Sequence, residues 1–316
     1  MNTEQATQKM TDVIRRKHFA LSTEQCYCGW LRRYCDYLVK LPVHLSSEQK
    51  LERFLTALAK DDVAASTQNQ AFNAIIFFYK EALGSELKNI QALRARQPEQ
   101  VRRAPSQADT LRLITAVQKE AGFTASLAVR LLYGCGLRVT EPLNLRIKDV
   151  DLEAAQLIIR SAKGGKDRVV SNPCSTLTDL RDQTEAARVI WKRDQLNQVP
   201  VALPHQLAAK YPRAPFDWNW AWLFPAHEPC LDPRTGKLVR WRWHEANVQR
   251  AIRKASVQTG LFILPHELRH AYATHCLNRG SNPKAIQEVM GHKALETTMA
   301  YLHADALSVR SPLDAG

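Results

Sequence analysis

The sequence predicts a mainly α-helical protein with a small β-sheet. Apolar residues recur at helical spacing through most of the chain, and one region has two β-prone runs around a glycine pair. A length of 316 residues suggests two domains of about 150 residues each. A polar, basic stretch containing Pro98 and Pro105 lacks an apolar period and marks the boundary. We therefore expect domains at 1–92 and 106–316, joined by a linker at 93–105.

The first domain is expected to be a helical bundle. Apolar residues follow helical spacing over 22–38, 46–60 and 65–83. Ser22 and Ser46 each stand at the start of such a segment with glutamine three residues later, the pattern of a capping box. Several short helices of this kind bury their apolar faces only against one another, which predicts a bundle.

The second domain is expected to combine helices with a β-hairpin. Helices are predicted at 108–120, 124–133, 140–145, 266–280 and 283–290, and a last one, capped by Thr297 or Thr298, carries Tyr301. Asn282 and Gly291 are placed to begin and end the helix at 283–290. The β-prone runs 156–160 and 168–171 predict the hairpin, with Lys163 near its tip.

The charge balance favours a nucleic-acid partner. The chain has 44 Lys+Arg against 31 Asp+Glu, so 44 − 31 gives a net charge of +13 and a pI near 9.5. Such an excess is typical of proteins that neutralise phosphates, although a basic enzyme with another substrate shows it too. The N-terminus lacks the apolar segment of a signal peptide, and the seven cysteines show no C-x-x-C spacing. We expect a cytoplasmic protein with no membrane anchor.

The pentapeptide His266–His270 has two incompatible interpretations. As His-Glu-x-x-His it is the zinc-peptidase signature, with two imidazoles one helical turn apart. A histidine as third ligand would fall at Cys276, although Glu288 could serve instead. Arg269 would then place a fixed positive charge close to the metal. The other interpretation takes His266 and Arg269 together as ligands of a phosphate.

The second interpretation fits metal-free cleavage of a phosphodiester. This reaction needs a nucleophile, fixed positive charge on the non-bridging oxygens and a proton for the leaving 5′-oxygen. A tyrosine can attack, but with a pKa of about 10 only about one in a thousand is ionised at neutral pH, so it needs cations or a base nearby. The chain contains the full set: Arg138, Lys163, His266, Arg269, His292 and Tyr301.

These residues stand in motifs that resemble those of the tyrosine recombinases. The motifs are Cys135–Glu141, Lys163–Arg168, His266–His270, Met290–His292 and Tyr301. The resemblance implies a SAM-like core-binding domain followed by an α+β catalytic domain, with no cofactor. It also implies that Arg138 and Arg269 hold the scissile phosphate, while Lys163 protonates the leaving oxygen. His266 would manage the proton of the nucleophile, His292 would bond the transition-state oxygens, and Tyr301 would form the 3′-phosphotyrosyl bond.

A narrower resemblance is to the integron integrases. It rests on Ala64–Gln70, Leu203–Pro212, Trp222–Ala226 and Val309–Asp314. The second and third of these lie in a segment at about 195–226, here called the insert, that phage and Xer-type relatives lack. The resemblance implies two DNA partners, a duplex attI site and an attC site folded from a single strand, whose extrahelical bases the protein must capture by stacking.

Candidate DNA contacts follow from charge, aromatic character and this resemblance. They are Arg32, Arg33, Lys166, Arg168, His205, Lys210, Trp218, Trp220, Arg240, Trp241, Arg242 and His244. Core packing is the alternative for each tryptophan, and a solvated helix face is the alternative for the arginines of the first domain. Where the integron integrases lead us to expect a His-His pair, this chain has Trp241-Arg242.

Three further alternatives involve DNA. A Xer-like or phage-type recombinase would act on duplex sites, a type IB topoisomerase would use similar chemistry, and a DNA-binding protein without catalysis would need only the helical bundle. The insert argues against the first two, and the complete set of six residues argues against the third. The resemblance also predicts a homotetramer on two DNA sites, with the tail at 302–316 packed on a neighbouring subunit.

Overall fold

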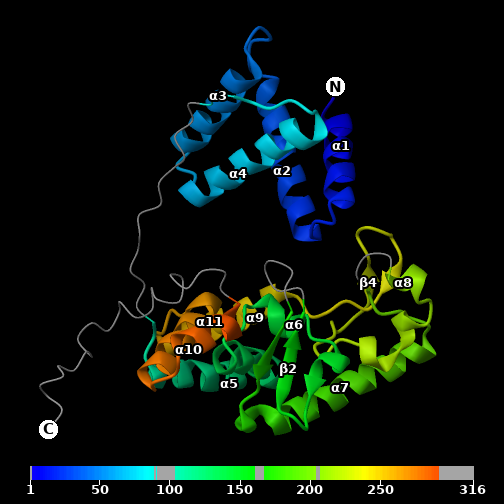
Figure 1. Cartoon of the computed structure of the whole chain (residues 1–316), viewed down its shortest axis with the longest axis vertical. Helices are drawn as coiled ribbons and strands as arrows, with labels where there is room; N and C mark the ends of the chain where they lie inside the picture. The colour runs from blue at the N-terminus through cyan, green and yellow to red at the C-terminus, as the bar shows by residue number, and fades with distance from the viewer. Residues whose placement is uncertain (1, 89, 91–103, 161–166, 204–206, 292–316) are drawn as a thin grey trace, which may run out of the picture. The chain divides into compact units, whose positions relative to one another are not determined.

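The computed structural model describes residues 2–88, 90, 104–160, 167–203 and 207–291. The chain forms two compact units, Met1–Gln100 and Val101–Gly316. Both units are mostly helical, and the small sheets lie in the second, as Figure 1 shows. The predicted fold class is therefore confirmed. Over the described ranges, no helix has the length and apolar character needed to cross a membrane.

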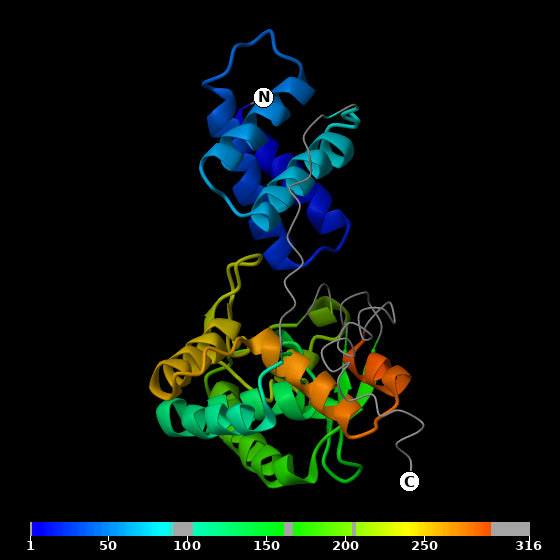
Figure 2. The same cartoon turned by 90° about the vertical axis from the view of Figure 1, so that its left-hand side faces the viewer.

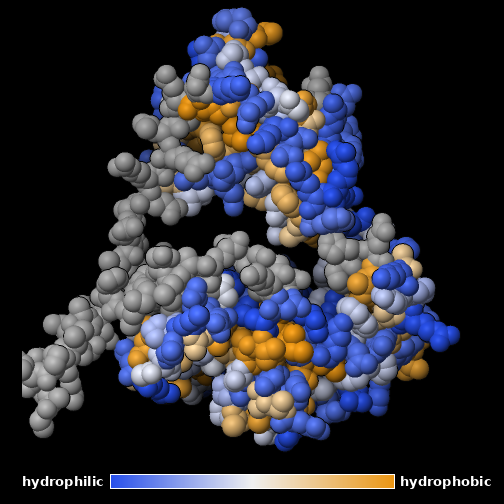
Figure 3. Space-filling view, viewed as in Figure 1, coloured by the Kyte–Doolittle hydropathy of each residue, from blue (hydrophilic) through white to orange (hydrophobic). Residues whose placement is uncertain are grey.

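The N-terminal unit is built from four helices. They are α1 (Thr3–Arg16), α2 (Leu21–Leu38), α3 (Ser47–Lys60) and α4 (Ala65–Phe77), which continues into a π-helical turn over Phe78–Ala82. Its core contains Met10, Leu31, Leu51 and Ile75, one from each helix and all fully buried. The unit thus has a core of its own, and its visible face is mostly hydrophilic with small hydrophobic patches (Figure 3).

Two details of this unit differ from the sequence-based prediction. Helix α1 was not predicted, although the Asn2 side chain caps it. Helix α2 begins at Leu21 after Ala20, so the predicted Ser22 cap is wrong. The Ser46 cap is confirmed, because its hydroxyl accepts from the Gln49 backbone N–H at 3.2 Å while the Gln49 side chain accepts from Ser46 at 3.1 Å.

The C-terminal unit is organised around one long helix, α5 (Gln107–Gly134). It bends at Gly122, which has a φ of +81°, so the two helices predicted over 108–133 are two arms of one bent element. Helices α9 (Glu245–Thr259) and α10 (Pro265–Asn278) pack against α5 (Figures 1 and 2). Their shared core includes Leu113, Leu131, Ile252 and Leu268.

A three-stranded antiparallel sheet lies beside these helices. Its strands, in spatial order, are β1 (Val150–Asp151), β2 (Gln156–Ile159) and β3 (Arg168–Ser171). Ile159 pairs with Arg168 and Gln156 with Ser171, which confirms that the two predicted β-prone runs pair with each other. A second, two-stranded sheet pairs β4 (Cys230–Leu231) with β5 (Leu238–Val239).

The remaining elements connect the core to the insert and to the predicted site. They are α6 (Thr140–Leu143), α7 (Leu177–Leu196), α8 (Leu207–Lys210), α11 (Pro283–Met290) and short 3₁₀ turns at Ile147–Asp149, Cys174–Thr176, Ala214–Phe216 and Trp218–Trp220. The predicted ends of α11 are confirmed, because Asn282 caps its start and Gly291 ends it with a φ of +62°. Helices α7 and α9 were not predicted.

Candidate active site

Three arginines from distant parts of the chain surround one buried carboxylate. The Glu141 side chain on α6 accepts from Arg138 Nη1 at 2.8 Å and from Arg168 Nη2 at 2.7 Å. Arg269 Nη1 on α10 lies 3.7 Å from the same carboxylate. We call Arg138, Arg168 and Arg269, with Glu141, the arginine cluster. It unites two residues predicted to hold phosphate with Arg168, which was predicted only as a DNA contact.

The same three arginines also bind the C-terminal end of α11. Arg168 Nε donates to the Val289 carbonyl at 2.5 Å. Arg269 Nη2 donates to the Met290 carbonyl. Arg138 Nη2 lies 3.4 Å from the Gly291 carbonyl. Three successive carbonyls of one helix end thus each receive one guanidinium. Because those carbonyls carry the negative end of the helix dipole, three cations there are favourable.

Burial differs sharply within the cluster. The side chains of Arg269 and Glu141 are 2% and 7% exposed, that of Arg168 is 10% exposed, and that of Arg138 is 27% exposed. Arg138 is thus the member that reaches solvent. Burial would raise the pKa of the Glu141 carboxyl, but the hydrogen bonds from Arg168 and Arg138 outweigh it and lower that pKa below its usual value. Glu141 is therefore ionised at neutral pH, and the cluster carries three positive charges against one negative.

Gly136 allows Arg269 to reach the cluster. It has a φ of +60°, and its carbonyl accepts from Arg269 Nη1 at 2.6 Å. A Cβ at this position would lie 2.7 Å from Cε1 of Tyr272. Glycine is therefore required both by the left-handed backbone and by the aromatic ring packed against it.

The residues of the pentapeptide His266–His270 on α10 make different kinds of contact. Arg269 is buried in the cluster, whereas His266 is exposed and stands edge-on to His270, with ring centroids 4.3 Å apart. The Glu267 carboxylate accepts the Leu264 backbone N–H at 2.7 Å and so caps the start of the helix. In the described ranges, no three His, Cys, Asp or Glu side chains are grouped as metal ligands.

Five predicted site residues lie outside the described residues. They are Lys163, Lys166, His205, His292 and Tyr301.

The insert is joined to the segment that follows the Arg138 motif. The Ile147 N–H donates to the Ala221 carbonyl at 3.0 Å, and Leu223 donates to the Leu145 carbonyl at 3.0 Å. The buried Arg146 guanidinium lies 3.1 Å from the centre of the Trp222 ring and donates to the Trp220 carbonyl at 2.7 Å. Burial lowers the pKa of Arg146 to about 9. Trp222 is thus a core residue, and Arg146 fixes the turn that carries Trp220.

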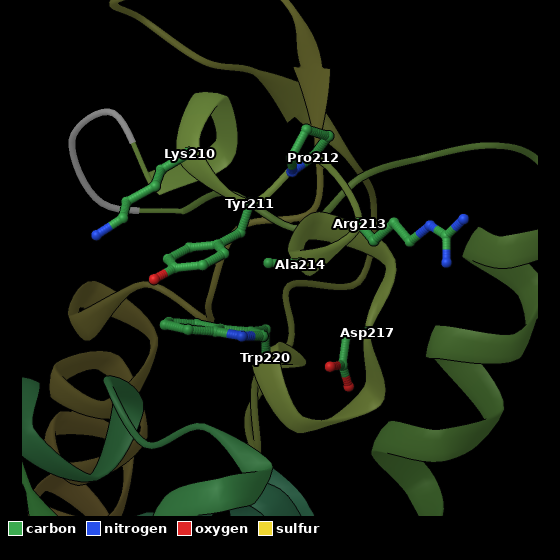
Figure 4. A pocket seen from close by; sticks show the side chains of 7 residues that line it. All are labelled: Lys210, Tyr211, Pro212, Arg213, Ala214, Asp217 and Trp220. Carbon is green, nitrogen blue, oxygen red and sulfur yellow. The ribbon is translucent and has the colours of Figure 1, made fainter.

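A cavity of about 720 Å³ opens in the insert, as Figure 4 shows. Its lining residues are Lys210, Tyr211, Pro212, Arg213, Ala214, Asp217 and Trp220. In Figure 4 the rings of Tyr211 and Trp220 lie one above the other, with Lys210 and Arg213 pointing away from them on opposite sides. The Lys148 ammonium lies 2.9 Å from the centre of the Trp220 ring, although Lys148 does not line the cavity.

The other predicted DNA contacts differ in how far they are exposed. Arg32 and Arg33 are exposed on α2, and His244 is exposed while its Nδ1 caps α9. Trp218 is half-buried against Trp191, and Trp241 is half-buried as well.

Two arginines near the insert make strong contacts within the protein. Arg242 pairs with Glu245 at 3.0 Å. Arg240 is 2% exposed, and its guanidinium binds the Asp194 carboxylate at 2.5 and 2.7 Å. This burial corrects the prediction for Arg240, which holds the insert against α7 instead of facing solvent.

Sequence reasoning missed three residues of this region. They are Tyr211, Asp217 and Lys148, of which only Tyr211 lies in a quoted motif, Leu203–Pro212, and none was named as a candidate contact. Tyr211 adjoins Lys210 and Asp217 adjoins Trp218, so a search for aromatic and charged side chains through the insert was the available signal. Lys148 lies outside the insert, and only the fold brings it to Trp220.

Comparisons with known proteins match both units. The profile of the Phage integrase family covers residues 105–307, and that of the phage integrase N-terminal SAM-like domain covers residues 7–89. A protein named Integrase/recombinase from Escherichia coli is 37% identical over 318 residues, covering 97% of this chain and 92% of the relative. Tyrosine recombinase XerA from Pyrococcus furiosus is 27% identical over 263 residues, covering 83% and 78%.

Solved structures share the fold. A lambda integrase (residues 75–356) dimer bound to a COC′ core site matches with a TM-score of 0.64 and 14% identity, covering 98% of this chain and 99% of that one. The Tn1549 transposon integrase in complex with transposon right end DNA matches with a TM-score of 0.62 and 15% identity, covering 94% of each chain. The family profile over residues 105–307 and the 37% identical relative show that the chain belongs to the phage integrase family, and it is a site-specific tyrosine recombinase.

Proposed function

We propose that this recombinase is an integron integrase, which joins a duplex attI site to an attC site folded from a single strand. The cavity of the insert carries this proposal, because it offers two aromatic rings and flanking cations to a base that has left its helix. The 37% identical relatives from Escherichia coli and Pseudomonas aeruginosa bear only the name Integrase/recombinase, which fits this activity and also a duplex recombinase.

The proposed chemistry uses the six predicted residues. The Tyr301 hydroxyl oxygen bonds to phosphorus while the bond from phosphorus to the 5′-oxygen breaks. The phenolic proton passes to His266, and the 5′-oxygen takes a proton from Lys163. Arg138, Arg269 and His292 stabilise the charge on the non-bridging oxygens. Because the 3′-phosphotyrosyl bond keeps the energy of the phosphodiester, a new 5′-hydroxyl can reverse the step without ATP.

The different exposures of Arg138 and Arg269 support different parts for them in phosphate binding. Arg138 already reaches solvent, so it makes the first contact with the scissile phosphate. Arg269 is buried, with N–H groups on the carbonyls of Gly136 and Met290. These two bonds use two of the five N–H groups of the Arg269 guanidinium, and its positive charge adds to that of Arg138 in attracting the phosphate.

A nicked attC-like hairpin tests the nucleophile. The nick lets the cleaved fragment diffuse away, so a covalent protein–DNA adduct accumulates and is counted on a denaturing gel. Wild type is expected to give the adduct, and Tyr301→Phe is expected to bind the hairpin without forming it. An adduct that persists in Tyr301→Phe would exclude Tyr301 as the nucleophile.

The cavity is tested with the same hairpin, made with and without its extrahelical bases. Trp220→Ala is expected to weaken binding of the complete hairpin about 5- to 150-fold, since stacking on one aromatic ring contributes about 1–3 kcal/mol. Binding of the hairpin without those bases should stay unchanged. Equal weakening on both hairpins, or wild-type preference for a duplex site, would favour a Xer-like recombinase.

The tetramer is proposed on the same basis, with the tail at 302–316 packed on a neighbouring subunit. Deleting the residues after Ala306 is expected to weaken the pairing of two DNA sites while single-site binding is retained. Unchanged pairing would contradict this arrangement.

A further inference from the structure

Arg168 was predicted to contact DNA, but in the structure its guanidinium binds other groups of the protein. It comes from β3, yet its guanidinium donates to both oxygens of Glu141, at 3.1 and 2.7 Å, and to the Val289 carbonyl at 2.5 Å. With a side chain 10% exposed, it lies behind Arg138, which is 27% exposed. Arg168 is therefore less accessible to DNA than Arg138 is.

The charge of Glu141 explains what Arg168 does. Glu141 also contacts Arg138 at 2.8 Å and Arg269 at 3.7 Å. A carboxylate this close to both phosphate-binding arginines weakens the attraction of each for a phosphate. The bidentate hydrogen bonds from Arg168 offset that negative charge. With Arg168 the cluster carries a net charge of +2, since three arginines face one glutamate, and without it the net charge is +1.

We propose that Arg168 is a positioning residue for strand cleavage, which binds Glu141 and the end of α11 so that Arg138 and Arg269 can bind the scissile phosphate. This proposal rests on the proposed function in one respect, namely that the arginine cluster binds the scissile phosphate of DNA. Arg168 acts through Glu141 and does not touch the reacting atoms. Removing Glu141's charge should therefore remove most of the need for Arg168.

The test measures the rate of adduct formation on the nicked attC-like hairpin. Arg168→Gln is expected to lower the rate about 100-fold, the lower end of the loss for a group that contacts the oxyanion directly, because Arg168 acts only through Glu141. Arg168→Gln combined with Glu141→Gln is expected to recover at least about tenfold of that loss, because no carboxylate is left to neutralise. Arg168→Lys keeps the charge and should be faster than Arg168→Gln.

A second substrate shows whether Arg168→Gln slows cleavage by removing positive charge or by disturbing the structure of the site. A methylphosphonate at the scissile position lacks one anionic oxygen, so its cleavage needs less positive charge. The deficit of Arg168→Gln, relative to wild type, should fall below about tenfold on this substrate. Thermal unfolding and hairpin binding of each variant report whether it is folded.

The outcomes are distinct. If wild type forms no adduct with Tyr301, the proposed function fails whatever Arg168 does. If wild type forms the adduct and Arg168→Gln is equally fast, the inference fails. It also fails if the double variant is no faster than Arg168→Gln and the deficit is the same on phosphate and methylphosphonate, because Arg168 then has only a structural role.

Discussion

Gly136 is the residue on which the geometry of the arginine cluster depends most directly. Its φ is +60°, and a Cβ at this position would clash with the Tyr272 ring. Its carbonyl accepts a hydrogen bond from Arg269. Gly136→Ala is expected to lower the free energy of unfolding by about 2–4 kcal/mol, because strain at positive φ adds to overpacking against the ring. Urea denaturation followed by tryptophan fluorescence measures this loss.

Gly260 provides the matched control for that measurement. It also has a positive φ, +72°, but a Cβ there would meet no atom within 4 Å. Gly260→Ala is therefore expected to cost about 1 kcal/mol from backbone strain alone. Equal losses in the two variants would show that the Tyr272 ring moves aside without cost.

Single residues were predictable where chemistry alone selects them. Arg138 and Glu141 are three residues apart, so their ion pair could be expected from the sequence. Arg168 is 27 residues from Glu141, and its place in the cluster depends on the register of β3 against β2. A basic residue near a hairpin is as compatible with DNA contact as with burial, so charge alone could not assign it.

The insert depends, at the scale of elements, on one buried ion pair. Arg240 follows β5, Asp194 lies on α7, and both side chains are at most 4% exposed. Asp194→Ala is expected to lower the free energy of unfolding by about 3–5 kcal/mol, because it leaves the Arg240 charge buried without its partner. Chemical denaturation of the full chain measures the change.

The exposed pair of Glu185 and Arg188 on the same helix is the comparison. Their side chains are 68% and 42% exposed. Glu185→Ala should change the free energy of unfolding by less than about 1 kcal/mol. A small effect of Asp194→Ala would mean that water reaches Arg240 when its partner is removed.

Helices were predictable where an apolar stripe faces a core. Pro265 and Gly280 gave the approximate ends of α10, and Asn282, Pro283 and Gly291 gave the ends of α11. Helix α7 was missed because its buried face carries polar residues, Gln183 and Asp194, beside Leu180 and Ala187. Helix α9 was missed although its buried residues Val248, Ile252 and Ala255 follow helical spacing.

The whole molecule is strongly basic, and its net charge of +13 predicts salt-sensitive DNA binding. The logarithm of the association constant for DNA should fall linearly with the logarithm of the salt concentration, with a slope of about −0.9 for each phosphate neutralised on duplex DNA. Arg32→Ala is expected to reduce the magnitude of that slope by about 1, since Arg32 is exposed on α2. Fluorescence anisotropy over a range of salt concentrations measures the slope.

Arg15 is the control for this prediction, because its guanidinium already binds Glu24 at 2.8 Å. Arg15→Ala should leave the slope nearly unchanged. An equal reduction in both variants would mean that the N-terminal unit binds DNA through its general charge and not through the exposed face of α2.

The arginine cluster joins parts of the chain that are far apart in the sequence. Its members come from α6, β3 and α10, and the carbonyls that they bind end at Gly291. The segment up to residue 291 therefore belongs to the surroundings of the cluster as much as the four side chains do.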